Sequence, residues 1–185
     1  KKFFYDFPCS RKPLACIVSR MTSNTTANQI KITVKNLTEI ESIARHAHVG
    51  QKRRDGVTPY ILHPLRVADI LAAEGESNEV IAAGVLHDVL EDTRVTASDL
   101  RREGVPRVVI KTVETLTHQR GESYVEYIQR VSKSPMATAV KLADIRANME
   151  DAPTDRQIVK YTNALEILKD AEPKDAEPKA SGLMN

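Results

Sequence analysis

The chain has 185 residues, 41% of them hydrophobic, and a formal net charge of +2 at pH 7. This length fits one domain, and this apolar content can fill a substantial core. The near-balanced charge argues against a nucleic-acid-binding protein that depends on a broad basic surface, and the sequence contains no apolar run long enough to cross a membrane.

Residues 1–35 are predicted to be a leader that is either poorly ordered or foreign to the natural protein. Its apolar segment at residues 14–18 is too short for the hydrophobic region of a secretory signal peptide. Met21 is a candidate natural start, and the alternative is that this basic, acid-poor leader is a remnant of an organellar transit peptide. Both cysteines, Cys9 and Cys16, lie in the leader, so the rest of the chain has no disulfide framework and fits a reducing compartment such as the cytoplasm.

The other end of the chain is predicted to be a flexible charged tail at residues 171–185. A charged, proline-containing unit repeats within residues 170–179, and such a tract cannot bury a hydrophobic core. The folded domain is therefore expected to occupy residues 36–170.

Helical signals follow one another from about residue 36 onward. Asn36 or Thr38 is the expected N-terminal cap of the first helix, and Ser77 is that of the third. No convincing alternation of apolar and polar residues indicates a strand. The sequence therefore predicts an all-α bundle of about seven or eight helices. These helices are expected from about residue 36 to a basic loop at 50–59, over 63–74, from Ser77 through the segment that contains His87, from 96 to Gly104, and over about 106–116, 122–133, 136–150 and 154–169.

The segment that carries most chemistry is an apolar helical run with four polar side chains, those of His87, Asp88, Glu91 and Asp92. Burying a carboxylate among Val and Leu side chains raises its pKa and favours its neutral form, unless a cation or hydrogen bonds keep it ionised. On a helix His87 lies one turn from Glu91, and Asp88 one turn from Asp92, so all four can face one site. A bound divalent metal is the simplest compensating cation, and this suggests a hydrolase.

Two further residues in similar surroundings are candidates to complete the site. His63 lies directly before Pro64, which suits the first turn of a helix, so His63 is expected at a helix entrance. Asp144 lies in another apolar helical pattern, where it shares a face with Asn148. The sequence thus offers two imidazoles and two carboxylates for one metal.

Each candidate also has a purely structural interpretation. Taken alone, His63 reads more simply as a helix cap, and Asp144 as a salt-bridge partner of Lys141 or Arg146. The complete set favours a metal site, because mixed nitrogen and oxygen ligands suit Mn²⁺, Fe²⁺ or Zn²⁺. Positions left open to water would make such a site catalytic rather than structural.

Four ordered segments of the sequence resemble an HD-domain metal-dependent phosphohydrolase, and within that superfamily the hydrolase domain of RelA/SpoT-type alarmone enzymes, in a small single-domain form. The similarity covers about residues 43–151. A His-Asp pair alone is weak evidence, but a Glu-Asp pair one turn later, with all segments in order, is specific. The segments are residues 47–54, 58–64, 87–93 and 141–144, the last followed by Asn148 and Met149.

The resemblance implies an all-α HD fold and one bound divalent metal, usually Mn²⁺ in the alarmone branch, although another divalent transition metal also fits these ligand types. It assigns Glu91 and Asp92 to the catalytic water. The metal ligands that it implies are His63, His87, Asp88 and Asp144.

The resemblance also implies substrate contacts beside the metal. Arg53 and Arg54 would stack on a purine or neutralise phosphates, and guanidinium groups suit both tasks. The structural alternative for the two arginines is a solvated run of charge. Tyr60 and Asn148 would hydrogen-bond the nucleoside.

The implied reaction is hydrolysis of the alarmone (p)ppGpp, in which metal-bound hydroxide attacks the 3′-diphosphate and pyrophosphate leaves. The length leaves no room for a synthetase domain, so a hydrolase-only protein is expected. The expected partner is a guanine nucleotide alarmone or a related phosphorylated small molecule. Neither a nucleic acid nor a membrane is expected as a partner, and self-association stays open.

The sequence departs from the alarmone-hydrolase pattern at two places. Arg53-Arg54 stands where Arg-Lys is common, and Glu150-Asp151 stands where Arg-Thr is common. These acids either point into solvent or indicate a nucleotide other than guanosine bis(diphosphate). Two alternatives therefore stay open: an HD phosphohydrolase of another nucleotide or phosphorylated cofactor, and a catalytically inactive module that binds nucleotide or a protein partner.

Overall fold

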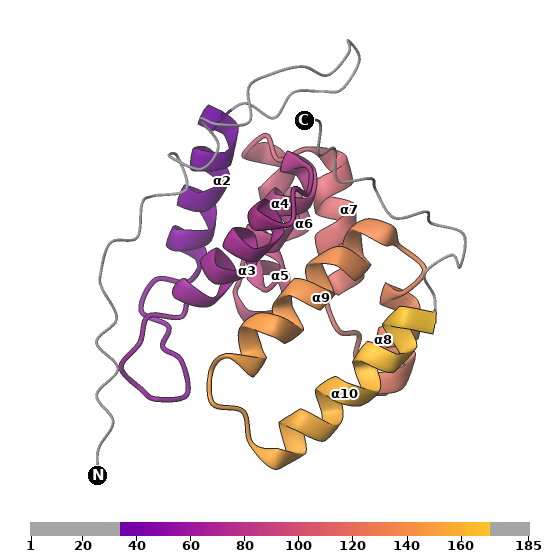
Figure 1. The fold of residues 1–185 in the computed structure, drawn as a ribbon. Coiled ribbons are helices and arrows are strands. Elements are labelled where there is room, and N and C mark those ends of the chain that lie inside the picture. The colour runs from indigo at the N-terminus through magenta and orange to yellow at the C-terminus, as the bar shows by residue number, and fades with distance from the viewer. Residues whose placement is uncertain (1–33, 171–185) are drawn as a thin grey trace, which may run out of the picture.

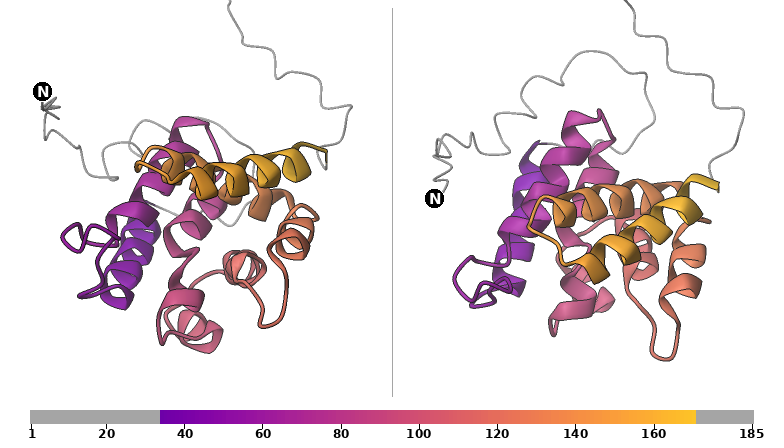
Figure 2. Two further views of the ribbon diagram at one scale, coloured as in Figure 1. Left: turned by 90° about the horizontal axis from the view of Figure 1, so that it is seen from below. Right: turned by 60° about the horizontal axis from the view of Figure 1, so that its bottom comes forward.

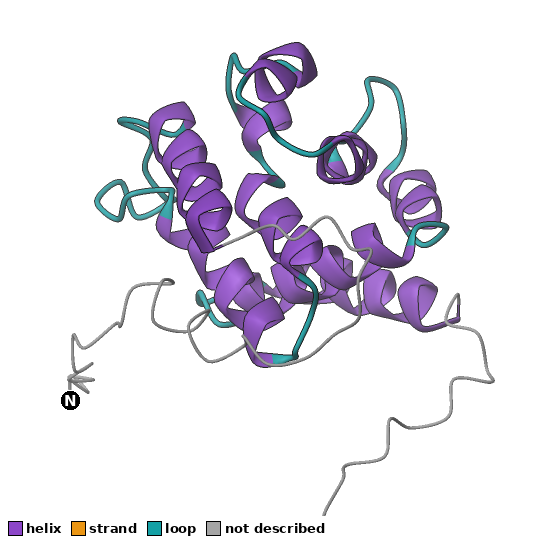
Figure 3. Cartoon of the chain, turned by 90° about the horizontal axis from the view of Figure 1, so that it is seen from above, coloured by secondary structure: helices purple, strands orange, loops and turns teal. Residues whose placement is uncertain are grey.

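The computed structural model describes residues 34–170, which form helices and loops without a strand (Figures 1 and 3). The predicted tail and all but the last two residues of the predicted leader lie outside the described residues. The all-α prediction is confirmed. Nine helices, two of them very short, occupy this part of the chain: α2 (Val34–Ala47), α3 (Leu62–Ala73), α4 (Asn78–Leu86), α5 (Val89–Asp92), α6 (Ala97–Arg102), α7 (Arg107–Leu116), α8 (Tyr124–Val131), α9 (Pro135–Met149) and α10 (Asp155–Asp170).

Most helix starts follow from their cap residues. The Ser77 side chain accepts a hydrogen bond from the backbone N–H of Val80, and Thr96 forms a reciprocal capping box with Asp99. The cap predicted for the first helix is wrong, because α2 begins at Val34 and both Asn36 and Thr38 lie inside it. The other predicted helices, apart from the one that contains His87, occur within a few residues of their expected bounds.

Helix α4 lies at the centre of the fold and packs against α2, α3, α7 and α9 (Figure 1). Every residue from Val80 to Leu86 is buried, which explains why this helix is apolar on all sides. Gly84 allows α4 to approach α3 closely, since a Cβ atom at this position would lie 2.5 Å from Cδ1 of Leu71. The central helix thus contacts both α3 and α9, which also contact each other, and both carry residues of the site.

The central helix ends at Leu86, and α5 starts only at Val89, so the continuous helix predicted through residues 87–92 is wrong. The carbonyl oxygen of Gly84 would accept the N–H of Asp88 in a continuing helix. Here it receives the Nδ1–H of His87, at 2.8 Å. A side chain thus competes with the backbone for the acceptor that the next turn needs, and the regular helix is interrupted at His87 and Asp88.

The last helix, α10, packs against α8 and α9. Figure 2 shows α10 running alongside α9, and α10 contacts both α8 and α9. Tyr161, Ala164 and Leu168 of α10 are buried against these neighbours. Within residues 34–170, no helix combines the length and apolar character that a membrane crossing requires.

Candidate metal centre

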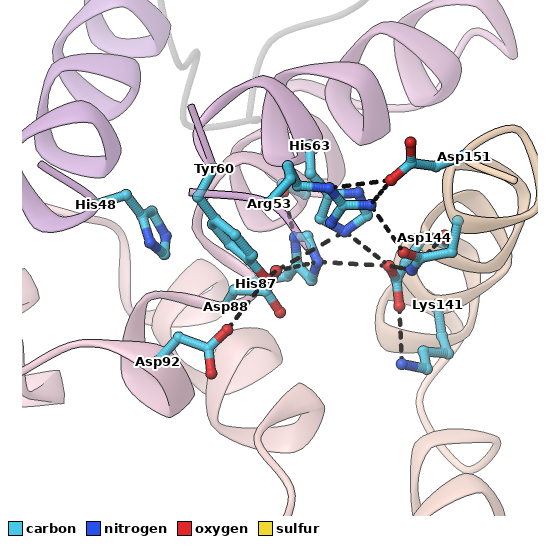
Figure 4. A network of polar contacts seen from close by, with 12 residues as sticks. His48, Arg53, Tyr60, His63, His87, Asp88, Asp92, Lys141, Asp144 and Asp151 are labelled. Atoms are coloured by element: carbon cyan, nitrogen blue, oxygen red, sulfur yellow. Dashed lines mark hydrogen bonds and ion pairs between the residues drawn. The ribbon is translucent and has the colours of Figure 1, made fainter. Parts of the chain in front are cut away.

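Three buried side chains from different parts of the fold converge beside the central helix. His63 comes from the first turn of α3, His87 from the end of α4, and Asp144 from the middle of α9. One nitrogen or oxygen atom of each lies within 4.8 Å of those of the other two. Nε2 of His63 is 3.0 Å from Oδ1 of Asp144, and Nε2 of His87 is 3.7 Å from the same oxygen (Figure 4). The predicted residues are therefore close enough to share one ion.

The ring of His87 is fixed by the break in the helix. Because Nδ1 donates its hydrogen to the carbonyl of Gly84, Nε2 faces the cluster. This Nε2 atom is buried and has no hydrogen-bond partner among the described residues, although Oδ2 of Asp88 lies 3.0 Å away. A buried imidazole nitrogen aimed at carboxylates calls for a cation, either a proton or a metal.

The electrostatics of the cluster point to the same need. Burial alone would lower the pKa of His87. The nearby carboxylates of Asp88 and Asp144 outweigh this effect, so that the pKa lies well above its ordinary value. In the absence of metal, the cluster therefore stabilises a proton on this ring. A divalent cation would satisfy the same carboxylates and the free Nε2 lone pair.

The two oxygens of Asp144 have different partners. Oδ2 accepts a hydrogen bond from Nζ of Lys141 at 2.8 Å, whereas Oδ1 faces the imidazoles and accepts one from Nδ2 of Asn148 at 2.6 Å. Burial would raise the pKa of Asp144, but the ammonium of Lys141 and the hydrogen bonds from the histidines hold it well below its usual range. Asp144 can thus form its salt bridge with Lys141 through one oxygen and face the metal site with the other.

Asp88, the fourth predicted ligand, lies at the edge of this cluster. Its Oδ2 atom is 3.8 Å from Nε2 of His63 and accepts a hydrogen bond from the hydroxyl of Tyr60 at 2.7 Å. The same hydroxyl lies 3.0 Å from Oδ2 of Asp92. Burial raises the pKa of Tyr60, and so do the two carboxylates, so its hydroxyl keeps its proton and separates the two acidic groups. The nucleoside contact predicted for Tyr60 stays a prediction.

Asp92 and Glu91, the two predicted catalytic carboxylates, have different hydrogen-bond partners. Asp92 is exposed and joined to Asp88 through Tyr60 (Figure 4). Glu91 accepts a hydrogen bond from the backbone N–H of His118, at 2.9 Å, in the loop between α7 and α8. Because the regular helix is interrupted at residues 87–88, helical spacing alone does not place Glu91, and the role predicted for it on the catalytic water stays a prediction.

His48 and Gln51, which were given no role in the site from the sequence, form a hydrogen-bonded chain that ends at the backbone of Asp92. Nδ1 of the buried His48 donates to Oε1 of Gln51 at 2.7 Å, and Nε2 of Gln51 donates to the backbone carbonyl of Asp92 at 2.8 Å. The His48 ring also lies 5.0 Å from that of Tyr60. Both residues fall in a segment that carries the family resemblance, but their contacts depend on how the loop folds back onto α5.

A cleft of about 850 Å³ opens beside the metal cluster. His63 belongs to the cluster and also lines the cleft. Arg53 and Arg54 line this cleft as well, and the substrate contacts predicted for them stay a prediction. Arg53 donates to Oδ2 of Asp151 from Nη2 at 2.6 Å, whereas Arg54 donates to the amide oxygen of Gln157 at 2.6 Å. Both arginines therefore border the cleft that His63 also lines, and Arg53 already has a carboxylate partner.

The fold and the buried His and Asp cluster are those of an HD domain. The model of the HD domain family matches residues 41–165, and the chain belongs to this family. HD domains bind divalent metals, and the cluster of His63, His87 and Asp144 supplies a suitable site.

Similar proteins include enzymes of alarmone metabolism. The GTP pyrophosphokinase of Streptomyces coelicolor is 34% identical over 154 residues, which are 76% of this chain and 18% of that protein. The guanosine-3′,5′-bis(diphosphate) 3′-pyrophosphohydrolase of Aquifex aeolicus is 36% identical over 115 residues, which are 58% of this chain and 16% of that protein. The chain thus matches only about a sixth of the length of these relatives.

One solved structure is similar over most of its length. It belongs to a metazoan ortholog of SpoT that hydrolyses ppGpp and plays a role in starvation responses. Its sequence is 27% identical, the TM-score is 0.62, and the match covers 80% of this chain and 88% of the other.

Proposed function

We propose that this protein is a metal-dependent 3′-pyrophosphohydrolase of guanosine 3′,5′-bis(diphosphate) and related alarmones, with Mn²⁺ as the preferred ion. The observation that carries the proposal is the buried cluster of His63, His87 and Asp144, which borders a cleft lined by arginines. The named activities of similar proteins, among them a 3′-pyrophosphohydrolase and a SpoT ortholog that hydrolyses ppGpp, support this choice of substrate.

The ligands of the ion would be His63, His87 and Asp144, joined by Asp88. When bound, a divalent ion supplies two effects: it lowers the pKa of water, and it offsets negative charge on a phosphoryl oxygen. Lys141 and Asn148 hold the carboxylate of Asp144 in place from behind. The protein thereby presents a fixed ligand set, which His63 connects to the cleft.

Asp92 is the carboxylate that we assign to the attacking water. It is exposed, and the hydroxyl of Tyr60 ties it to Asp88 at the edge of the cluster. The oxygen of water forms a bond to the phosphorus attached to the ribose 3′ oxygen, and Asp92 accepts the proton that this water loses. The bond between that phosphorus and the ribose oxygen breaks, and the ribose oxygen leaves as a hydroxyl after taking up a proton.

The test is a substrate panel with purified protein and Mn²⁺. Release of pyrophosphate and GDP from ppGpp is expected, with little release of phosphate from nucleoside monophosphates, nucleoside triphosphates or NADPH. Loss of this activity in His63→Ala protein would link it to the cluster. Rapid turnover of another compound beside negligible turnover of ppGpp would overturn the proposal.

The second candidate is an HD phosphohydrolase that acts on a less charged nucleotide or phosphorylated cofactor. The observation that favours it is the presence of Glu150 and Asp151 in the lining of the cleft, where an anionic substrate would lie. The same panel separates the two candidates.

A further inference from the structure

The C-terminal end of α9 brings two acidic residues to the arginines of the cleft. Nε and Nη2 of Arg53 lie 3.2 and 2.6 Å from Oδ2 of Asp151. Nε and Nη2 of Arg66, on α3, each donate to a different oxygen of Glu150 at 2.8 Å. Two guanidinium groups that line the cleft are therefore already paired with carboxylates of the protein.

The pair of Arg53 and Asp151 lies directly beside the metal cluster. Nη2 of Arg53 is 3.4 Å from Oδ1 of Asn148, and Nδ2 of Asn148 donates to Oδ1 of Asp144. Figure 4 shows Arg53 between the cluster and Asp151. A nucleotide whose phosphate reaches the metal would thus come within reach of this guanidinium.

The two members of the pair differ in how firmly they are held. The side chain of Arg53 is only 15% exposed, and its Cζ atom lies 5.8 Å from the centre of the Tyr60 ring. The side chain of Asp151 is 55% exposed. An incoming anion could displace the carboxylate into water at little cost, while Arg53 stays in place.

We infer that Asp151 is a specificity-determining residue, because it competes with the phosphate groups of a bound nucleotide for Arg53. The inference rests on the proposed function only for the choice of nucleotides as ligands. Each further phosphate adds negative charge close to the Asp151 carboxylate, so the penalty grows with the number of phosphates. Asp151 therefore biases the cleft toward less charged nucleotides.

Binding of GMP, GDP and GTP to the Mn²⁺-loaded protein tests this inference without any turnover. These probes lack a 3′-phosphate, so they are not substrates of the proposed reaction. Calorimetry should show that Asp151→Asn protein binds GDP roughly three- to fivefold more tightly than the wild type, the size expected for one screened charge. The gain should be larger for GTP than for GMP, and it should shrink at high salt.

Two further variants show whether the effect depends on Arg53. Asp155→Asn removes the same charge from the exposed first turn of α10, outside the lining of the cleft, and should leave nucleotide binding as in the wild type. In protein with Arg53→Gln, the additional change Asp151→Asn should give a clearly smaller gain, because only the direct repulsion between Asp151 and the phosphates is then left to relieve.

The opposite result has a clear meaning. If Asp151 only holds Arg53 in a productive position, Asp151→Asn protein will bind GDP as weakly as the wild type or more weakly, and the inference is wrong. A gain of the same size in protein without Arg53 also overturns it. Failure of the wild type to hydrolyse ppGpp would overturn the proposed function but leave this comparison of binding intact.

Discussion

Nε2 of His63 on α3 lies 3.0 Å from Oδ1 of Asp144 on α9, and Asp144 is one of the most deeply buried charged residues of the described chain. Replacing this carboxylate by an amide in Asp144→Asn protein removes the charge that a divalent ion would neutralise. Metal affinity should fall by more than about tenfold, since even the loss of a residue that supports a ligand costs that much. Elemental analysis after dialysis measures the effect, with Asp155→Asn as the charge-matched control. Full metal content in Asp144→Asn protein would remove Asp144 from the ligand set.

Asp92 is predicted to act on water without holding the metal. Asp92→Asn protein should lose roughly 10²- to 10⁴-fold in kcat, the usual contribution of a positioned proton acceptor. Its Mn²⁺ content should stay close to that of the wild type, because Asp92 lies outside the cluster of His63, His87 and Asp144. Steady-state kinetics and elemental analysis on the same sample give both values. Unchanged turnover would contradict the role of Asp92, and lost metal would reassign it to the ligands.

Lys141 compensates the charge of Asp144 on the side away from the imidazoles. Its side chain is only 14% exposed, so replacing it in Lys141→Met protein leaves a buried carboxylate without its ammonium partner. The metal-free variant should lose about 3 kcal/mol in the free energy of unfolding. Urea denaturation with a chelator present measures this loss, and Lys133→Met, at an exposed position, is the control. A variant as stable as the wild type would show that the pair contributes little.

Glu122 should make the free energy of unfolding depend on pH in a way that does not involve the metal site. Its carboxylate accepts two hydrogen bonds from Arg130, which lower its pKa from the ordinary 4.5 to about 2. A carboxyl group whose pKa is depressed in the folded state stabilises the protein above its unfolded pKa, and this stabilisation is lost as the pH falls through the folded value. The free energy of unfolding of the metal-free wild type should therefore decrease between about pH 4.5 and pH 2.

The comparison that isolates this effect is Glu122→Gln protein. At neutral pH the variant should be less stable than the wild type, and the difference should close toward pH 2. Urea denaturation at several pH values checks both parts. A difference that stays constant with pH would show that Glu122 does not titrate with a depressed pKa.

Gly84 is needed where α4 meets α3. In Gly84→Ala protein the new methyl group would meet Cδ1 of Leu71, which is fully buried. Overpacking should cost about 1 to 3 kcal/mol and outweigh the better helix propensity of alanine. Thermal denaturation measures the loss. In the double variant with Leu71→Ala, the effect of the added methyl group should become smaller, and strictly additive effects would contradict this explanation.

Much of the fold could be predicted from local sequence. Apolar periodicity located the helices, and Ser77 caps α4 as expected. The start of α2 was missed because Asn36 and Thr38 are good cap residues that the fold places inside a helix. The break at residues 87–88 was missed because it depends on a hydrogen bond from a side chain to the Gly84 carbonyl, which periodicity cannot reveal.

The site was predictable in its residue types and less so in its contacts. His63, His87 and Asp144 could be paired because each is a polar residue in an apolar helical context, and the structure brings them together. The contacts of Gln51 with Asp92, and of Arg53 with Asp151, join residues far apart in the sequence. Such contacts depend on tertiary packing, and no spacing rule predicts them.

The three residues that converge on the proposed ion come from α3, the end of α4, and α9, so an unfolded chain holds them far apart. The ion should therefore bind almost only to the native state, and each tenfold rise in its free concentration above the dissociation constant should add about 1.4 kcal/mol of stability. Resistance to heat would then follow the supply of the metal. When the proposed ion is scarce, the protein would lose the proposed activity and become more easily degraded at the same time.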